Sequence, residues 1–171
     1  MRIKTTDFKF DYTRYIEGMG KGLVLFKVKA NKKAIGQNYH YFYEDKKKPP
    51  LDIAVNPKNK MIEYVSFFAQ DEKIGQMSLN LNITFVTKNI TFDCFNIDAN
   101  PPEEKIMKNF ILNFNYNNLY LLDSEASQDL IGYEINIDNH ILFDQDNIFR
   151  GILFSNISDE EIKEMRQSVV L

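Results

Sequence analysis

The sequence of 171 residues contains a single cysteine, Cys94, and no tryptophan. The missing tryptophan, together with many Asn, Ile and Lys residues, is typical of an AT-rich, bacterial genome. One thiol excludes a disulfide within the chain, and so little cysteine is typical of a reducing compartment. The length is enough to bury roughly 70% of the unfolded surface in a hydrophobic core. We therefore expect one globular domain over residues 1–171 and a cytoplasmic location.

Long hydrophobic runs are also missing. The longest uninterrupted apolar stretches have only a few residues, whereas a bilayer-spanning helix needs about 20. The N-terminal sequence MRIKTTDFKFDY has neither the apolar segment nor the small-residue cleavage site of a secretory signal. We expect a soluble protein that does not enter a membrane.

The common catalytic and cofactor motifs are absent from the sequence. It has no G-x-S-x-G, H-E-x-x-H or G-x-G-x-x-G motif and no pair of cysteines, so no cofactor is expected. The glycines of residues 18–22 precede a strand pattern, which favours a hairpin loop over a phosphate loop. An unrecognised enzyme would have to use His40, His140 or Cys94. Cys94 shares strand parity with apolar neighbours, which predicts a small buried hydrophobe instead.

Charge is distributed unevenly along the chain. Residues 1–60 contain 14 Lys and Arg against 6 Asp and Glu, a difference of +8, and residues 61–171 contain 7 against 18, a difference of −11. This asymmetry either cancels inside one sheet or gives the molecule two faces of opposite sign. The sequence leaves both arrangements open.

Alternation of apolar and polar residues is the main periodic signal. It marks strands with one buried face near residues 8–12, 23–30, 39–43 and 79–85. Turn residues between apolar runs predict hairpins at residues 51–69, 77–97 and 110–122. We predict a mainly β (α+β) fold, a single-domain antiparallel sheet protein of about ten to twelve short strands, arranged as a sandwich, a meander or a half-barrel.

Two segments have the pattern of a helix. Asn100 as N-cap, proline in the first turn and early glutamates predict a short helix near residues 101–109. Ser158 and Glu161 have the spacing of a capping box, and they predict a C-terminal helix near residues 159–168.

Residues 135–154 raise the question of a metal site. Asp144 and Asp146 match the first two ligands of a calcium loop, but Ile148 and Phe149 occupy the third ligand and glycine positions. Asp138 and His140 could bind a transition metal with His40, but Asp138-Asn139 is better interpreted as a turn. The segment is predicted to be a β-meander with turns at 138–139 and 144–147, and to bind no metal.

The turns of this meander suggest a surface for a partner. We expect the carboxylates to lie along one edge of the molecule, exposed, where replacement of Asp138, Asp144 and Asp146 by Asn changes stability little. The predicted acidic edge consists of Asp129, Glu134, Asp138, Asp144 and Asp146. Such an edge would suit a non-catalytic protein-binding module with a basic partner, for example an immunity protein that neutralises a nuclease toxin.

A tyrosine ladder offers an alternative function. Tyr39, Tyr41 and Tyr43 alternate along one strand, and lysines lie nearby, including Lys46, Lys47 and Lys48. An exposed ladder of this kind would stack bases or sugars, which indicates nucleic-acid or carbohydrate binding. Tyrosines on one face of a strand are also typical of half-buried core residues with their hydroxyls at the rim. We favour the core interpretation, so that nucleic acid is the less favoured partner.

Overall fold

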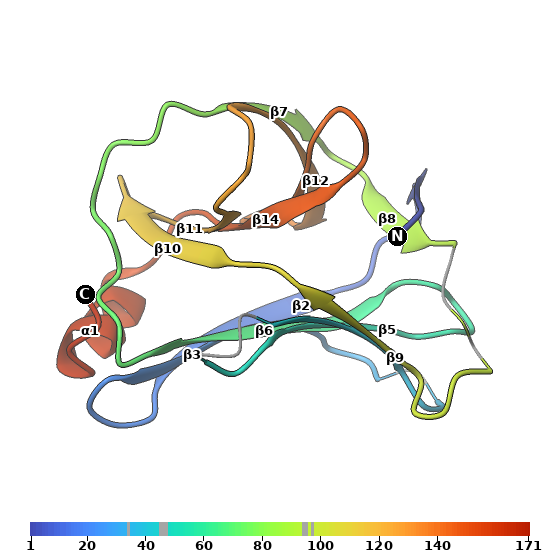
Figure 1. Cartoon of the computed structure of the whole chain (residues 1–171), viewed down its shortest axis with the longest axis horizontal. Coiled ribbons are helices and arrows are strands. Elements are labelled where there is room, and N and C mark those ends of the chain that lie inside the picture. The colour runs from blue at the N-terminus through green and yellow to red at the C-terminus, as the bar shows by residue number, and fades with distance from the viewer. Residues whose placement is uncertain (34, 45–47, 94–95, 97) are drawn as a thin grey trace.

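The chain forms two six-stranded β-sheets that lie one above the other (Figure 1). The computed structural model describes all residues except 34, 45–47, 94–95 and 97. Within the described residues there are fourteen strands and one helix, α1 (Asp159–Gln167). The predicted mainly β fold is confirmed, with more strands than the expected ten to twelve and with two parallel pairs in otherwise antiparallel sheets; the sandwich is the arrangement that forms.

The first sheet has the strand order β2-β3-β6-β5-β4-β9 and forms the lower layer of Figure 1. Its strands are β2 (Tyr12–Gly18), β3 (Leu23–Ala30), β6 (Ile62–Gln70), β5 (Leu51–Val55), β4 (Tyr39–Glu44) and β9 (Glu103–Met107). All neighbours are antiparallel except β4 and β9. Four of the six strands come from the basic residues 1–60.

The second sheet has the order β10-β11-β14-β13-β12-β7. Its strands are β10 (Phe110–Asn115), β11 (Asn118–Asp123), β14 (Phe149–Phe154), β13 (Asn139–Phe143), β12 (Asp129–Asn136) and β7 (Asn82–Val86). All six come from the acidic residues 61–171, so that the charge asymmetry of the sequence is divided largely between the two layers. A two-stranded ribbon of β1 (Ile3–Thr6) and β8 (Asn89–Phe92) completes the fold.

The main core lies between the sheets and is rich in aromatic side chains. The Phe26 and Phe67 rings stack at 5.0 Å within the first sheet, and Phe67 contacts Phe154 of the second sheet at 5.5 Å. Tyr43 meets Phe149 across the layers at 4.8 Å. Because the inward side chains of both sheets interdigitate here, the two layers are held together by apolar burial.

The opposite face of the second sheet carries its own small apolar cluster. Leu130, Leu142 and Leu153 are buried there, and Leu81 and Ile83 from the chain before and within β7 pack against them. Figure 1 shows this segment rising from the end of β6 in the lower layer to β7 in the upper layer. The second sheet is therefore packed on both faces, whereas the outer face of the first sheet points away from it.

Arg14 of β2 joins the two layers at one end of the sandwich. Its guanidinium forms a two-bond ion pair with Glu161 of α1, at 2.8 and 2.9 Å, and donates to the Ser155 carbonyl at 2.7 Å. Glu161 also belongs to the predicted capping box with Ser158, which the structure confirms. α1 is thus fixed to β2 by its own capping residue.

Most of the predicted local elements are confirmed. β5–β6, β10–β11 and the β12–β13–β14 meander are antiparallel hairpins, and residues 19–22 form the loop between β2 and β3. The turn between β12 and β13 is at Ile137–Asp138, one residue before the predicted position. No helix in the described ranges is long and apolar enough to cross a membrane.

The helix predicted at residues 101–109 is wrong. Residues 103–107 form β9, which lies parallel to β4, and the His40 amide donates to the Pro102 carbonyl at 3.0 Å. The open edge of β4 supplies the hydrogen bonds that a short isolated helix would have to form internally. In this register of β9 against β4, the side chain of Ile106 packs against the main core.

The hairpin predicted at residues 77–97 is also wrong. β7 pairs in parallel with β12 in the second sheet, whereas β8 pairs with β1. The TKN sequence between them does not close a hairpin but sends the chain from one sheet to another. In the same way, the strand predicted at residues 8–12 begins only at Tyr12.

Candidate functional site

The outer face of the first sheet presents apolar, aromatic and charged side chains on neighbouring strands. These outward residues alternate with the core residues of the same strands. They include Tyr15, Leu25, Lys27, Lys29, His40, Phe42, Asp52, Tyr64 and Phe68. We call this set the outer face.

Asp52 of β5 is the hub of the outer face. Its Oδ1 is 2.9 Å from His40 Nδ1 on β4, and its Oδ2 accepts a hydrogen bond from the Tyr64 hydroxyl on β6 at 2.7 Å. Both partners lie diagonally across the neighbouring strands, at the distance that long side chains bridge. Three strands are therefore connected through one carboxylate.

The hub sets the protonation of its two partners. The hydrogen bond to Asp52 raises the pKa of the His40 imidazole above its usual value, and burial opposes this shift. Burial and the same carboxylate raise the pKa of the Tyr64 hydroxyl. At neutral pH the hydroxyl therefore stays protonated and donates to Asp52.

The rings around the hub are packed against neighbours. The His40 and Phe42 rings stack with a centroid distance of 5.2 Å and an interplanar angle of 12°. Lys27 Nζ lies 4.5 Å from the centroid of the Tyr64 ring, a cation–π contact. One face of each ring is thus already in contact with another side chain of the outer face.

The chemistry of the hub favours positioning over proton transfer. A His–carboxylate pair activates a nucleophile in many hydrolases. Here the third group on Asp52 is the protonated Tyr64 hydroxyl, which acts as a hydrogen-bond donor. The hub therefore holds His40 and Tyr64 in fixed orientations on the sheet.

An open hollow lies at one end of the outer face, with a volume of about 340 Å³. Its lining residues come from β3, β4, β6 and the connection between β3 and β4: Lys27, Lys29, Lys33, Gly36, Gln37, Asn38, His40, Glu63 and Tyr64. Three of these are lysines. Among the described residues, neither Lys29 nor Lys33 forms an ion pair.

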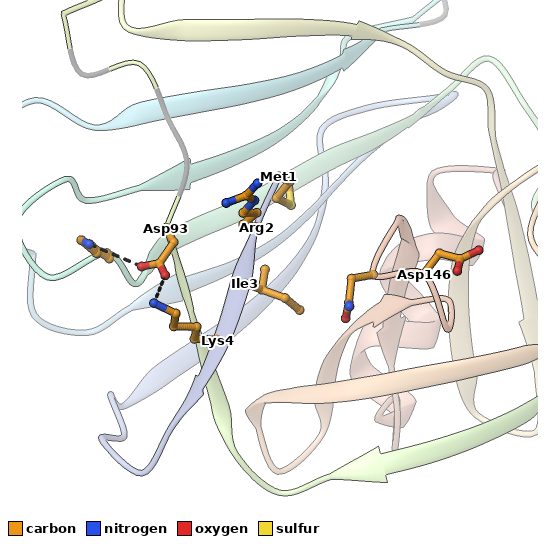
Figure 2. A pocket seen from close by; sticks show the side chains of 8 residues that line it. Met1, Arg2, Ile3, Lys4, Asp93 and Asp146 are labelled. Carbon is orange, nitrogen blue, oxygen red and sulfur yellow. Dashed lines mark hydrogen bonds and ion pairs between the residues drawn. The ribbon is translucent and has the colours of Figure 1, made fainter.

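A larger hollow, of about 640 Å³, lies beside the β1–β8 ribbon. Figure 2 shows Asp93 there between the amino groups of Lys4 and a second lysine, which is Lys60. Hydrogen bonds from both lysines lower the pKa of the Asp93 carboxyl. The positive charge of this hollow is therefore partly neutralised by its own wall.

The predicted acidic edge does not form a single surface. Asp138 is in the β12–β13 turn and Asp146 in the β13–β14 turn, and β13 separates these turns because they lie at opposite ends of it. Asp129 is exposed at the start of β12, and Glu134 pairs with Lys9 at 2.8 Å. The carboxylates are spread over the second sheet.

Asp144 is buried, so the prediction that it is exposed is wrong. Its side chain is only 11% exposed and accepts a hydrogen bond from Arg150 Nε at 2.8 Å. Arg150 also reaches Asp123, which Lys108 contacts at 2.8 Å. These four charges form a closed, balanced network between β11 and β14, in which Asp144 has a structural role.

The tyrosine ladder belongs to the core. Tyr39, Tyr41 and Tyr43 are buried, so that they cannot stack on a ligand. Lys48 pairs with Glu72 at 3.0 Å. Lys46 and Lys47 lie outside the described residues.

The other candidate residues are not brought together. His140 is buried in the second sheet, with its ring 4.8 Å from Phe85, and burial lowers the pKa of its imidazole. His40 is on the first sheet, so the two histidines are in different layers. Cys94 lies outside the described residues. No cluster of three or more His, Cys, Asp or Glu residues suited to a metal occurs in the part of the chain that the structure describes.

Sequence reasoning missed Asp52, Tyr64 and Lys27. One signal was present: His40 and Phe42 alternate with the tyrosines of the ladder, so one of the two sets had to face outward. No protein-family model and no curated protein matches this chain.

Proposed function

We propose that this protein is a non-catalytic module that binds another protein through the outer face. The observation that carries the proposal is the composition of that face, where Leu25, Phe42 and Phe68 occupy outward positions. Outward positions of an antiparallel sheet are usually polar. Leu25 and Phe68 are cross-strand neighbours, and Phe42 lies beside Asp52, two strands from Phe68. Outward apolar and aromatic residues with charged groups among them are typical of a protein interface.

The packing of the rings favours a protein over a nucleic acid or a carbohydrate. Bases and sugars bind by stacking on open aromatic faces. The His40 and Phe42 rings stack on each other, and the amino group of Lys27 lies over the Tyr64 ring. A side chain of a partner protein can pack against the edges of such a cluster, and preordered aromatic groups lose little conformational entropy on binding.

The hypothesis of an immunity protein against a basic nuclease stays a prediction. It requires one continuous acidic edge, but Asp138 and Asp146 lie at opposite ends of β13 and Asp144 is paired with Arg150. The outer face instead carries the half-buried Lys27 and the exposed Lys29 beside its apolar residues. These lysines support a partner with an acidic surface.

The experiment compares two surface variants. The double variant Phe42→Ser/Phe68→Ser removes two apolar side chains from the outer face, and Ile111→Ser removes an exposed one from the second sheet. Immobilised wild-type protein and both variants are incubated with lysate of the native host, and captured proteins are identified by mass spectrometry. A purified candidate is then titrated by calorimetry against all three.

We expect a partner that the wild type and Ile111→Ser bind equally and that the double variant binds at least about 30-fold more weakly, the loss of a typical hot spot of about 2 kcal/mol. Circular dichroism must show that the double variant is folded. A partner that binds the folded double variant with wild-type affinity contradicts the proposed surface.

A further inference from the structure

The lysine-lined hollow beside the outer face carries an unbalanced positive charge. Its lining contains three lysines and one carboxylate, that of the buried Glu63, and the Asp52 carboxylate lies directly behind the lining residue His40, so the net charge is about +1 when His40 is neutral. Lys29 and Lys33 have no ion-pair partner among the described residues, whereas the lysines of the larger hollow share Asp93. Unpaired cations around a hollow attract an anionic group.

The spacing of the lysines suits an extended chain. Lys27 and Lys29 are two residues apart on the same face of β3, which places their backbones about 7 Å apart. Carboxylates on alternate residues of an extended acidic segment have the same spacing. The hollow, at about 340 Å³, has room for one or two such side chains.

We propose that this hollow binds an acidic, extended segment of the partner protein, with two alternate Asp or Glu side chains at Lys27 and Lys29 and with Lys33 beside them. The inference rests on the proposed function, because the hollow is continuous with the outer face through Lys27, His40 and Tyr64. The apolar residues provide most of the contact, and the lysines select an acidic segment over a basic one and speed its association.

The test uses the full chain and a defined probe, acetyl-hexaglutamate amide. Binding is followed at low ionic strength by NMR chemical-shift changes of the isotope-labelled protein. The variant Lys29→Gln/Lys33→Gln removes two charges from the hollow. The control Lys73→Gln/Lys163→Gln removes two exposed charges elsewhere and leaves the same net charge.

We expect saturable binding with shift changes in residues 27–40 and at Tyr64. The hollow variant should bind roughly tenfold more weakly, as the loss of two ion pairs at a surface predicts, and the control less than about twofold. Absence of saturable binding overturns the inference, as does equal weakening by both variants. Tighter binding of inorganic phosphate or of a six-nucleotide oligothymidylate at the same residues also overturns it, because the hollow would then be a phosphate site.

The partner itself separates this inference from the proposed function. If Phe42→Ser/Phe68→Ser abolishes partner binding and Lys29→Gln/Lys33→Gln leaves its affinity and salt dependence unchanged, the outer face is the interface and the hollow is not part of it. If the folded Phe42→Ser/Phe68→Ser variant binds normally, the proposed function fails whatever the probe does.

Discussion

Asp144 and Asp146 lie two residues apart in the β13–β14 turn, and the structure predicts opposite results when each is replaced by Asn. Asp146 is exposed, whereas Asp144 is held by Arg150. Asn at position 144 keeps an oxygen for the Asp146 and Ile148 amides, both at 2.9 Å. Its NH2 group, however, faces the Nε–H donor of Arg150. One charged hydrogen bond is therefore lost.

The loss of stability in Asp144→Asn depends on the contacts that Arg150 keeps. A hydrogen bond between charged groups contributes about 1.5–3 kcal/mol. Arg150 keeps its contact with Asp123 at 2.6 Å, so the loss stays below the roughly 3–5 kcal/mol of a wholly unpaired buried charge. We expect Asp144→Asn to lower the free energy of unfolding by about 2 kcal/mol. Asp146→Asn should change it by less than about 0.5 kcal/mol.

The assay is thermal and urea unfolding of wild type and both variants at pH 7. For a chain of this size 1 kcal/mol corresponds to about 2–4 °C, so Asp144→Asn should lower Tm by about 4–8 °C. Equal melting temperatures for the two variants would refute the ion-pair account. They would restore the view that both aspartates serve only the turn.

The pH dependence provides a second check. Burial alone would raise the pKa of the Asp144 carboxyl, but hydrogen bonds from the Ile148 amide and Arg150 bring it below its usual value of 3.8. The stabilisation is therefore fully present above that value and is lost as the pH falls through the lower, folded-state pKa. The difference in stability between wild type and Asp144→Asn should be constant near neutral pH and shrink in strong acid.

Three further predictions concern the packing of the layers and the hub. Arg14→Met should lower the free energy of unfolding by about 3 kcal/mol, because it leaves the Glu161 carboxylate without its ion pair; Arg14→Lys should cost less, and urea unfolding measures both. NMR titration should show the His40 pKa above 6.5 in the wild type and lower in Asp52→Asn. The stabilisation from this pair is present below pH 6.5 and is lost as the pH rises through the raised pKa, so a Tm difference between wild type and Asp52→Asn that grows with pH would contradict it. Gly151→Ala should lower Tm strongly, since its Cβ would collide with a backbone carbonyl of β11, and an unchanged Tm would show that the strand can shift.

Elements whose signals are local could be predicted from the sequence. The hairpin of β5 and β6, the meander of β12 to β14 and the capping box of α1 each contain both the apolar pattern and the turn or cap that ends it. Neighbouring strands joined by a short turn pair with each other at little entropic cost. These elements are confirmed within a residue or two of the predicted positions.

Elements that depend on distant partners could not be predicted. β7 has the alternation of a hairpin strand, but its partner is β12, more than forty residues later. β9 has the residues of a helix start and becomes a strand because β4 offers an open edge. Local propensity is worth less than the hydrogen bonds and burial that a neighbouring strand provides.

The sequence by itself determined that residues 39–44 alternate between two sets of side chains, the tyrosines on one side and His40 and Phe42 on the other. It could not determine which set faces outward, because both contain aromatic residues. Only the second sheet decided this, since packing against it buries the tyrosines and leaves His40 beside Asp52 and Tyr64. The hub joins three strands through contacts between residues that are diagonal to one another. Two residues on neighbouring strands become diagonal neighbours only when the register of those strands is fixed. That register is set by the free energy of the whole packed sheet and not by any one segment.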